Sequence, residues 1–267
     1  MKNVKWFLFI GLGLLLFFYS RTDGKDSVNA DASSAMRSYD PTYNPDQSIA
    51  DFLTYRALLT GQAKMAVTGS SVTRGSGSSQ QSKTWRGISQ EKLRHTHKAL
   101  RNLTITNHGH SGYTSVRLLE DEVTAPIIKE KPDVLFIETS VINNHNKNVS
   151  MEDTFESLKK LHKLYSDELP ETKVYFLSPN PCTENKFGPK VNALGYTFED
   201  YVQATAEFIQ EQGWPYFDTH TTMLNEMEKQ NIPLSSTLKD GIHPNDKGYA
   251  IWGKVLFPYF IQKIEQD

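Results

Sequence analysis

Short apolar runs of strand length alternate with helix-patterned segments through most of this 267-residue chain, which limits the folds that it can adopt. The expected strands are residues 64–67, 103–106, 134–138, 174–177 and 216–218. Capping boxes are expected before two of the helices between them, at Ser150 with Asp153 and at Thr197 with Asp200. This alternation is typical of an α/β domain with a parallel five-stranded sheet between two layers of helices.

The composition suits one large domain with a packed core, since 38% of the residues are hydrophobic and 11% are aromatic. The formal net charge is −2, so the chain lacks the basic surface of a nucleic-acid-binding protein, and we predict no nucleic-acid partner. The single cysteine, Cys182, excludes an intrachain disulfide and a cysteine-based metal cage. His108, His110 and His145 suggest zinc, but no carboxylate stands at ligand spacing beside them, so we predict no metal and no cofactor.

The first residues differ from the rest of the chain. Lys2 and Lys5 precede an uncharged run over residues 6–19, which predicts residues 1–21 as a signal peptide or an N-terminal membrane anchor. No small-x-small cleavage site follows cleanly, so cleavage stays open. Residues 22–47, rich in Asp, Ser, Asn and Ala, are expected to be a flexible linker, and residues 48–267 the folded domain. We therefore expect an exported protein at the cell surface or secreted, in contact with the membrane if residues 1–21 remain.

Polar loops follow the first three expected strands, and another precedes the last helix: residues 69–75, 107–114, 138–145 and 240–244. The carboxyl ends of parallel strands lie along one edge of a sheet, where ligands bind, so we expect these loops to meet. Ser71 supplies a hydroxyl, His243 could take its proton, and Asp240 could orient the imidazole. The N–H groups of Gly112 and Ser71 and the side-chain amide of Asn143 are candidate donors to an oxyanion.

Each motif also has a purely structural interpretation. Ser70 and Ser71 are typical turn residues, Asp240 followed by glycine is a turn signal, and Asn245 could cap a helix. The joint occurrence of the motifs favours catalysis.

Taken in order, these motifs resemble a known family. Gly-x-Ser-x-x-x-Gly at 69–75, Asn-x-x-x-Ser-Gly-x-Thr at 107–114, an Asn after the strand at 134–138 and Asp-x-x-His-Pro at 240–244 are similar to the four blocks of the SGNH hydrolases, or GDSL esterase/lipase family. The resemblance implies a flavodoxin-like three-layer α/β/α fold for a catalytic domain over residues 48–267. It also implies ester hydrolysis without a metal, with a nucleophile at Ser71, an acid–base pair at Asp240 and His243, and oxyanion donors at Gly112 and Asn143.

The chain departs from the family pattern at two places. Ser70 stands where the family usually has Asp, so a local carboxylate is missing. Ile142 stands where the third block usually has its Asn, so Asn143 is the expected donor and Asn144 the alternative.

The substrate is expected to be a small acyl ester, most plainly an acetyl ester on a carbohydrate, because the residues near the expected site are polar. Arg74, His108, Tyr113 and Asn144 are the predicted substrate contacts, and the loop at 179–189 is expected to form one wall of the cleft. Three alternatives remain open: an O-acetyltransferase using the same serine, a lipase or thioesterase of the family, and a catalytically weak glycan-binding surface protein. A monomer is expected.

Overall fold

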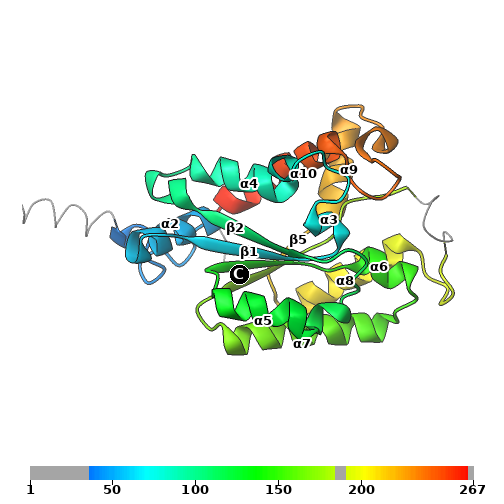
Figure 1. Ribbon diagram of the computed structural model, residues 1–267, viewed down its shortest axis with the longest axis horizontal. Coiled ribbons are helices and arrows are strands. Elements are labelled where there is room, and N and C mark those ends of the chain that lie inside the picture. Colours follow the sequence, from blue (N-terminus) through cyan, green and yellow to red (C-terminus); the bar gives the residue numbers. More distant parts are fainter. Residues whose placement is uncertain (1–35, 184–190, 264–267) are drawn as a thin grey trace, which may run out of the picture.

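The computed structural model describes residues 36–183 and 191–263 (Figure 1). Its central sheet contains β1 (Lys64–Gly69), β2 (Thr104–Gly109), β3 (Val134–Glu138), β4 (Lys173–Leu177) and β5 (Tyr216–Phe217). The strands are parallel and lie in the order β2-β1-β3-β4-β5. The predicted α/β fold with a five-stranded parallel sheet is confirmed, and β1 and β2 run on to Gly69 and Gly109, beyond their predicted ends.

Helices cover both faces of the sheet (Figure 1). One layer contains α2 (Ile49–Thr60), α4 (Trp85–Arg94), α9 (Thr219–Lys229) and α10 (Asp246–Ile261), and the other contains α5 (Asp121–Glu130), α7 (Met151–Glu168) and α8 (Phe198–Glu211). Two short helices, α3 (Ser71–Arg74) and α6 (Val141–Asn146), follow β1 and β3 directly. The 3-10 turns are η1 (Gln81–Lys83), η2 (Lys98–Asn102), η3 (Arg117–Leu119) and η4 (Leu234–Thr237).

The sheet separates two large apolar clusters, and a third, smaller cluster packs α6 against α8. Val134 and Phe136 of β3 belong to the cluster under α4 and α10, whereas Leu135 and Ile137 belong to the cluster under α5 and α7. Successive strand residues point to opposite faces, and both faces are covered, so these strands read as continuous apolar runs rather than as alternating patterns.

The helix starts follow the predicted capping chemistry. The Thr197 backbone N–H donates to the Asp200 carboxylate at 2.7 Å, and the Asp200 N–H donates back to the Thr197 hydroxyl at 3.1 Å, which confirms the capping box before α8. At α7 the Asp153 N–H donates to the Ser150 hydroxyl as predicted, but that hydroxyl itself donates to the Asp153 carboxylate.

The predicted N-terminal segment at 1–21 and the linker residues up to 35 lie outside the described residues. Residues 36–47, also assigned to the linker, form turns in which the Tyr39 ring lies 5.4 Å from the His97 ring and Gln47 is fully buried. No helix in the described part of the chain is long and apolar enough to span a membrane. The predicted domain boundaries remain predictions.

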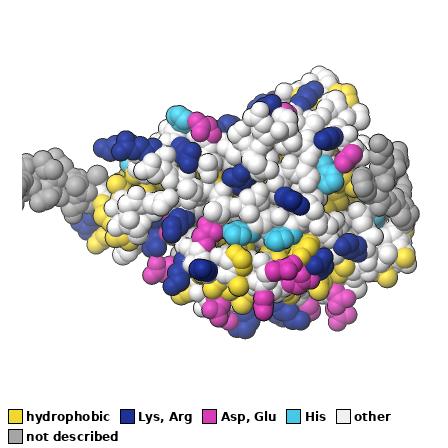
Figure 2. All heavy atoms as spheres, viewed as in Figure 1, with side chains coloured by type: hydrophobic (Ala, Val, Ile, Leu, Met, Phe, Trp, Pro, Cys, Tyr) yellow, Lys and Arg dark blue, Asp and Glu magenta, His cyan; other side chains and the backbone are white. Residues whose placement is uncertain are grey.

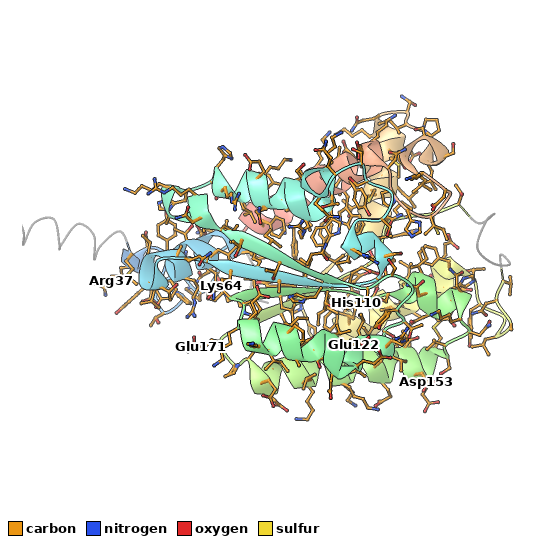
Figure 3. The ribbon with its side chains drawn as sticks, viewed as in Figure 1. Arg37, Lys64, His110, Glu122, Asp153 and Glu171 are labelled. Atoms are coloured by element: carbon orange, nitrogen blue, oxygen red, sulfur yellow. The ribbon has the colours of Figure 1, made fainter. Side chains whose placement is uncertain are left out.

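The carboxyl ends of the strands form one end of the molecule. In Figure 3, His110 lies there beside Glu122 at the start of α5, whereas Lys64 marks the opposite ends of the strands. On the face shown in Figure 2, basic and acidic side chains are interspersed rather than gathered by sign. The loops expected to carry the chemistry therefore share the edge that His110 marks.

Candidate active site

Ser71 is the first residue of α3, immediately after the turn that ends β1. Gly69, with φ of +151°, allows this turn: a Cβ atom there would lie 2.6 Å from the Cβ atom of Glu138. Ser70 is the N-cap, and its hydroxyl accepts the Val72 N–H at 3.4 Å. The first N–H groups of a helix have no partner within it, so the Ser71 N–H can serve a bound oxygen.

The structure brings Ser71 together with His243 and Asp240. Nε2 of His243 lies 2.9 Å from Oγ of Ser71, and Nδ1 lies 2.7 Å from Oδ2 of Asp240. A carboxylate only accepts hydrogen bonds, so Nδ1 carries the proton and Nε2 accepts the hydrogen bond from the serine hydroxyl. This arrangement fits a hydroxyl, a base and a group that orients the base.

The Asp240 carboxylate also organises its own turn. Its Oδ1 atom accepts the backbone N–H groups of Ile242 at 3.2 Å and His243 at 2.9 Å. Burial alone would raise the pKa of Asp240, but the hydrogen bonds from the His243 ring and from these two N–H groups outweigh it and hold the pKa below its usual value. The carboxylate therefore stays ionised beside the imidazole at neutral pH.

The loop after β4 supports this turn. The Asn180 side-chain amide donates to the Ile242 carbonyl at 2.9 Å, and the Thr183 N–H donates to the Gly241 carbonyl at 2.7 Å. We predicted this loop as a wall of the substrate cleft. Its described part contacts the turn at residues 240–243, here called the acid–base turn. Residues 184–190 lie outside the described residues.

Two further residues that hold the acid–base turn and α3 in place were not predicted from the sequence. Gly77, with φ of +94°, lies so close to the acid–base turn that a Cβ atom there would come within 3.0 Å of the His243 Cβ atom. The buried Tyr249 hydroxyl lies 3.0 Å from the Val72 carbonyl and 2.9 Å from the Ser76 carbonyl, so α10 is tied to α3. Neither residue belongs to a recognisable motif, because each acts through contacts remote in sequence.

Of the two other predicted oxyanion donors, Asn143 lies in α6 and Gly112 lies in the loop that follows β2. The Asn143 amide donates one hydrogen to the Tyr113 carbonyl at 2.8 Å, which leaves its second hydrogen for another acceptor. Gly112 has φ of +74°, and its carbonyl accepts from Nζ of Lys147 at 2.6 Å. The His110 N–H donates to the Gly69 carbonyl at 2.8 Å, so this loop is also anchored to the strand that precedes Ser71.

Asn144 does not fit its predicted roles. It is fully buried, its Oδ1 atom accepts the Ser115 N–H, and its amide donates to the hydroxyls of Ser115 and Thr154 at 2.7 and 2.9 Å. With its polar atoms bonded inside the protein, Asn144 cannot contact a substrate. It instead anchors the Gly112 loop to α7, and its assignment as a substrate contact or alternative oxyanion donor is corrected.

Arg74 lies next to the loop that contains Gly112. Its guanidinium donates to the Ser111 hydroxyl at 3.2 Å, one residue before Gly112. Arg74 is exposed, and its predicted contact with substrate remains a prediction.

The side chains of His108 and Tyr113 are held by α5. Nε2 of His108 lies 2.9 Å from the Glu130 carboxylate, and the Tyr113 hydroxyl donates to Glu122 while its ring lies 3.7 Å from the Arg117 guanidinium. Their predicted contact with substrate remains a prediction.

No cluster of three or more histidine, cysteine or acidic residues suited to a metal ion occurs in residues 36–183 and 191–263.

A model of the GDSL-like lipase/acylhydrolase family matches residues 67–251, which is more than half of the chain. The chain belongs to this family. The resemblance drawn from the four sequence blocks is therefore confirmed.

Relatives and solved structures agree with this placement. A multidomain esterase from Ruminococcus flavefaciens is 27% identical over 173 residues, which cover 60% of this chain and 21% of that protein, so the chain spans about a fifth of this curated relative. A two-domain esterase active on acetylated mannans has a similar fold, with a TM-score of 0.59 and 21% identity over 80% of this chain and 54% of that one. So has an acetyl-xylooligosaccharide esterase from Geobacillus, with a TM-score of 0.58 and 18% identity over 77% and 97%.

Proposed function

We propose that the protein is a serine esterase that hydrolyses small acyl esters, above all O-acetyl groups on carbohydrate. The hydrogen-bonded chain from Oγ of Ser71 through the His243 ring to Asp240, at 2.9 and 2.7 Å, carries the proposal. Membership of the GDSL-like lipase/acylhydrolase family supports it.

In the first half of the reaction, Oγ of Ser71 attacks the ester carbonyl carbon while Nε2 of His243 takes the hydroxyl proton. Asp240 keeps Nδ1 protonated and stabilises the imidazolium. The carbon–oxygen bond to the alcohol then breaks, and the alcohol oxygen takes the proton from Nε2. The acyl group remains on Ser71 as an ester.

In the second half, Nε2 takes a proton from water, and the resulting hydroxide oxygen bonds to the acyl carbon. The bond to Oγ of Ser71 then breaks, Oγ regains the proton from Nε2, and the carboxylic acid leaves. The N–H groups of Ser71 and Gly112 and the amide of Asn143 are the proposed donors to the oxyanion in both halves.

The proposed substrate class rests on the side chains beside Ser71 and on the relatives. Arg74, Ser111 and Lys147 surround Gly112 with polar groups, which suit a hydrated sugar ester better than a lipid chain. The two solved neighbours act on acetylated mannans and acetyl-xylooligosaccharides. An acetyl ester on a polysaccharide is therefore the proposed substrate.

The proposed place of action is outside the cytoplasm. Lys2, Lys5 and the uncharged run at 6–19 support export. Fusion of residues 1–35 to a reporter enzyme that is active only after export tests this: an active fusion supports the proposal, and an inactive one contradicts it.

The central experiment measures hydrolysis of p-nitrophenyl acetate by the full chain and by Ser71→Ala and His243→Ala. Both variants are expected to lose about 10³-fold or more in kcat, because removing either residue breaks the proton-transfer chain. Ser82→Ala and His95→Ala are matched controls at exposed positions and should leave the rate unchanged. An inert parent, or a Ser71→Ala variant as fast as the parent, would contradict the catalytic assignment.

A second measurement tests the substrate class. Acetate release from acetylated xylan and mannan oligosaccharides is expected to exceed turnover of p-nitrophenyl octanoate. Faster octanoate turnover would indicate a lipase instead, and transfer of acetyl to added sugar acceptors in preference to water would indicate an acetyltransferase.

A further inference from the structure

Glu138, at the end of β3, has a fully buried carboxyl group. Its Oε2 atom accepts the Ser70 N–H at 2.6 Å and the Thr73 hydroxyl at 3.3 Å, and its Oε1 atom accepts the Ser140 N–H at 2.8 Å. This carboxyl group therefore accepts hydrogen bonds from two separate segments, one at residues 70–73 and one at Ser140.

Those two segments, α3 and α6 with the turns that precede them, carry the proposed nucleophile and one proposed oxyanion donor. Ser70 and Thr73 flank Ser71, and Ser140 is the N-cap of α6, three residues before Asn143. A shift of the Glu138 carboxyl group would therefore move both loops, and with them the distance between the reacting groups.

The backbone is shaped around this carboxyl group on both sides. Gly69 leaves the space that it fills, since a Cβ atom there would lie 2.7 Å from Oε2 of Glu138. Ser140 adopts φ of +57°, a left-handed conformation that costs energy for a residue other than glycine, and its N–H points to Oε1. The hydrogen bond offsets part of that cost.

No basic side chain neutralises Glu138, because none of the ion pairs among the described residues includes it. Burial raises the pKa of its carboxyl group, and hydrogen bonds from Ser70, Ser140 and Thr73 only partly offset this. A buried carboxyl group held by donors alone is costly, so its presence calls for a specific role.

We propose that Glu138 is a positioning residue that holds the Ser71 turn and the Asn143 loop in the geometry needed for acyl transfer. Its two oxygens are the common acceptors for both loops. This proposal rests on the proposed esterase function, and it adds a residue that does not touch the substrate.

The first test is Glu138→Gln, which keeps the shape but replaces one oxygen by NH₂. In either orientation of the amide, the N–H of Ser70 or of Ser140 loses its acceptor. We expect kcat to fall roughly 10–100-fold while KM stays within about 3-fold, because a small misplacement of reacting groups lowers the rate without weakening binding. Unchanged kcat, or a change confined to KM, would overturn the proposal.

Asp133→Asn is the matched control, since Asp133 is a buried carboxylate just before the opposite end of β3. It accepts the Lys64 N–H at 2.8 Å and Nε of Arg56 at 2.6 Å, far from the loops that carry Ser71 and Asn143. We expect its melting temperature to fall while kcat stays unchanged. An equal loss of kcat in both variants would mean that Glu138 is merely structural.

The second test moves the carboxyl group. Ser70→Asp places a second carboxyl beside Glu138 in a fully buried site, so like charges should lower kcat. In the double variant Ser70→Asp with Glu138→Gln, one carboxylate remains, and the amide introduced at position 138 can donate to it. We expect kcat about 10-fold or more above the product of the two single effects. Effects that simply multiply would overturn the proposal; if Ser70→Asp does not fold, Glu138→Gln against Asp133→Asn decides.

The melting temperatures of the parent, the two single variants and the double variant separate this proposal from the proposed function. The coupling between positions 70 and 138 appears in them whether or not the chain hydrolyses esters. An inert parent with strong coupling would therefore refute the esterase function alone, whereas an active parent with neither thermal nor kinetic coupling would refute the role of Glu138.

Discussion

The turn at residues 240–243 shows how local sequence can orient the proposed catalytic histidine. Asp240 and His243 are three residues apart, and the Asp240 carboxylate accepts both the imidazole N–H and the backbone N–H of the same histidine. These hydrogen bonds join residues only three positions apart, which is why this part of the site could be predicted from the sequence.

Asp240→Asn tests this arrangement. The amide can place its NH₂ against Nδ1 and so stabilise the wrong tautomer of His243, for which we expect kcat on p-nitrophenyl acetate to fall about 10⁴-fold. Because the folded pKa of Asp240 is lowered, its contribution to stability is complete above its ordinary value of 3.8 and is lost as pH falls through the folded value.

Thermal unfolding across pH checks the sign of this effect. The difference in melting temperature between the parent and Asp240→Asn should be constant between about pH 6 and 8 and should shrink below about pH 4. A difference that grows toward acid pH would contradict the lowered pKa.

Asn143 and Asn144 are adjacent, but the structure predicts opposite consequences of replacing them. Asn143→Ala removes a proposed oxyanion donor from a partly exposed position, so kcat should fall about 10²–10³-fold with little change in stability. Asn144→Ala leaves buried partners such as the Ser115 N–H unsatisfied, so the free energy of unfolding should fall by about 1–3 kcal/mol. Kinetics and thermal unfolding of both variants check this contrast; a kcat loss confined to Asn144→Ala would reverse the assignment.

The sequence alone could not separate these two asparagines. Both follow β3 in a polar run, and the choice depends on which of them faces Ser115 and Thr154, residues 29 and 10 positions away. The hydrogen bonds of Glu138 could not be predicted for the same reason, because its partner Ser70 lies 68 positions away.

At the scale of elements, α3 must lie directly against β2 to present Ser71. Gly109 makes this possible, because a Cβ atom there would lie 2.3 Å from the backbone nitrogen of Arg74. Asn107 strengthens the contact by donating to the Arg74 carbonyl at 3.1 Å. The end of β2 therefore helps to position the proposed nucleophile, Ser71, together with β1, the strand that precedes it.

Gly109→Ala should push α3 away from β2. We expect the free energy of unfolding to fall by about 1–3 kcal/mol and kcat to fall as well, since Ser71 moves with α3. Thr104→Ala, at the opposite end of β2, is the control and should change kcat little. Wild-type kcat in Gly109→Ala would show that α3 is not held by this contact.

The elements themselves were largely predictable, because apolar runs and caps are local signals. All five strands and the starts of α7 and α8 were found at or near their predicted positions. The short helices α3 and α6 were not predicted as helices. Each has fewer than two turns and depends on the carboxyl group of Glu138 and on neighbouring loops rather than on its own residue pattern.

At the scale of the whole molecule, the residues that stabilise the fold and the residues of the candidate site lie in different parts of the structure. The apolar clusters on its two faces hold the layers together, while the loops at the carboxyl ends of the strands carry the polar groups. Residues 36–47 lie at the other end of the molecule from these loops (Figure 1). A change in this segment should therefore affect folding without affecting catalysis.

The boundary of the folded domain gives a test of this separation. A fragment of residues 48–267 lacks the contact between the rings of Tyr39 and His97, which are 5.4 Å apart, and exposes the site where Gln47 is buried. Relative to a fragment of residues 36–267, we expect it to lose about 1 kcal/mol of unfolding free energy, or about 2–4 °C in melting temperature, with kcat unchanged. Tyr39→Ala in the longer fragment should reproduce most of the loss. Equal melting temperatures would instead place the start of the domain at Ser48, as the composition of the chain predicts.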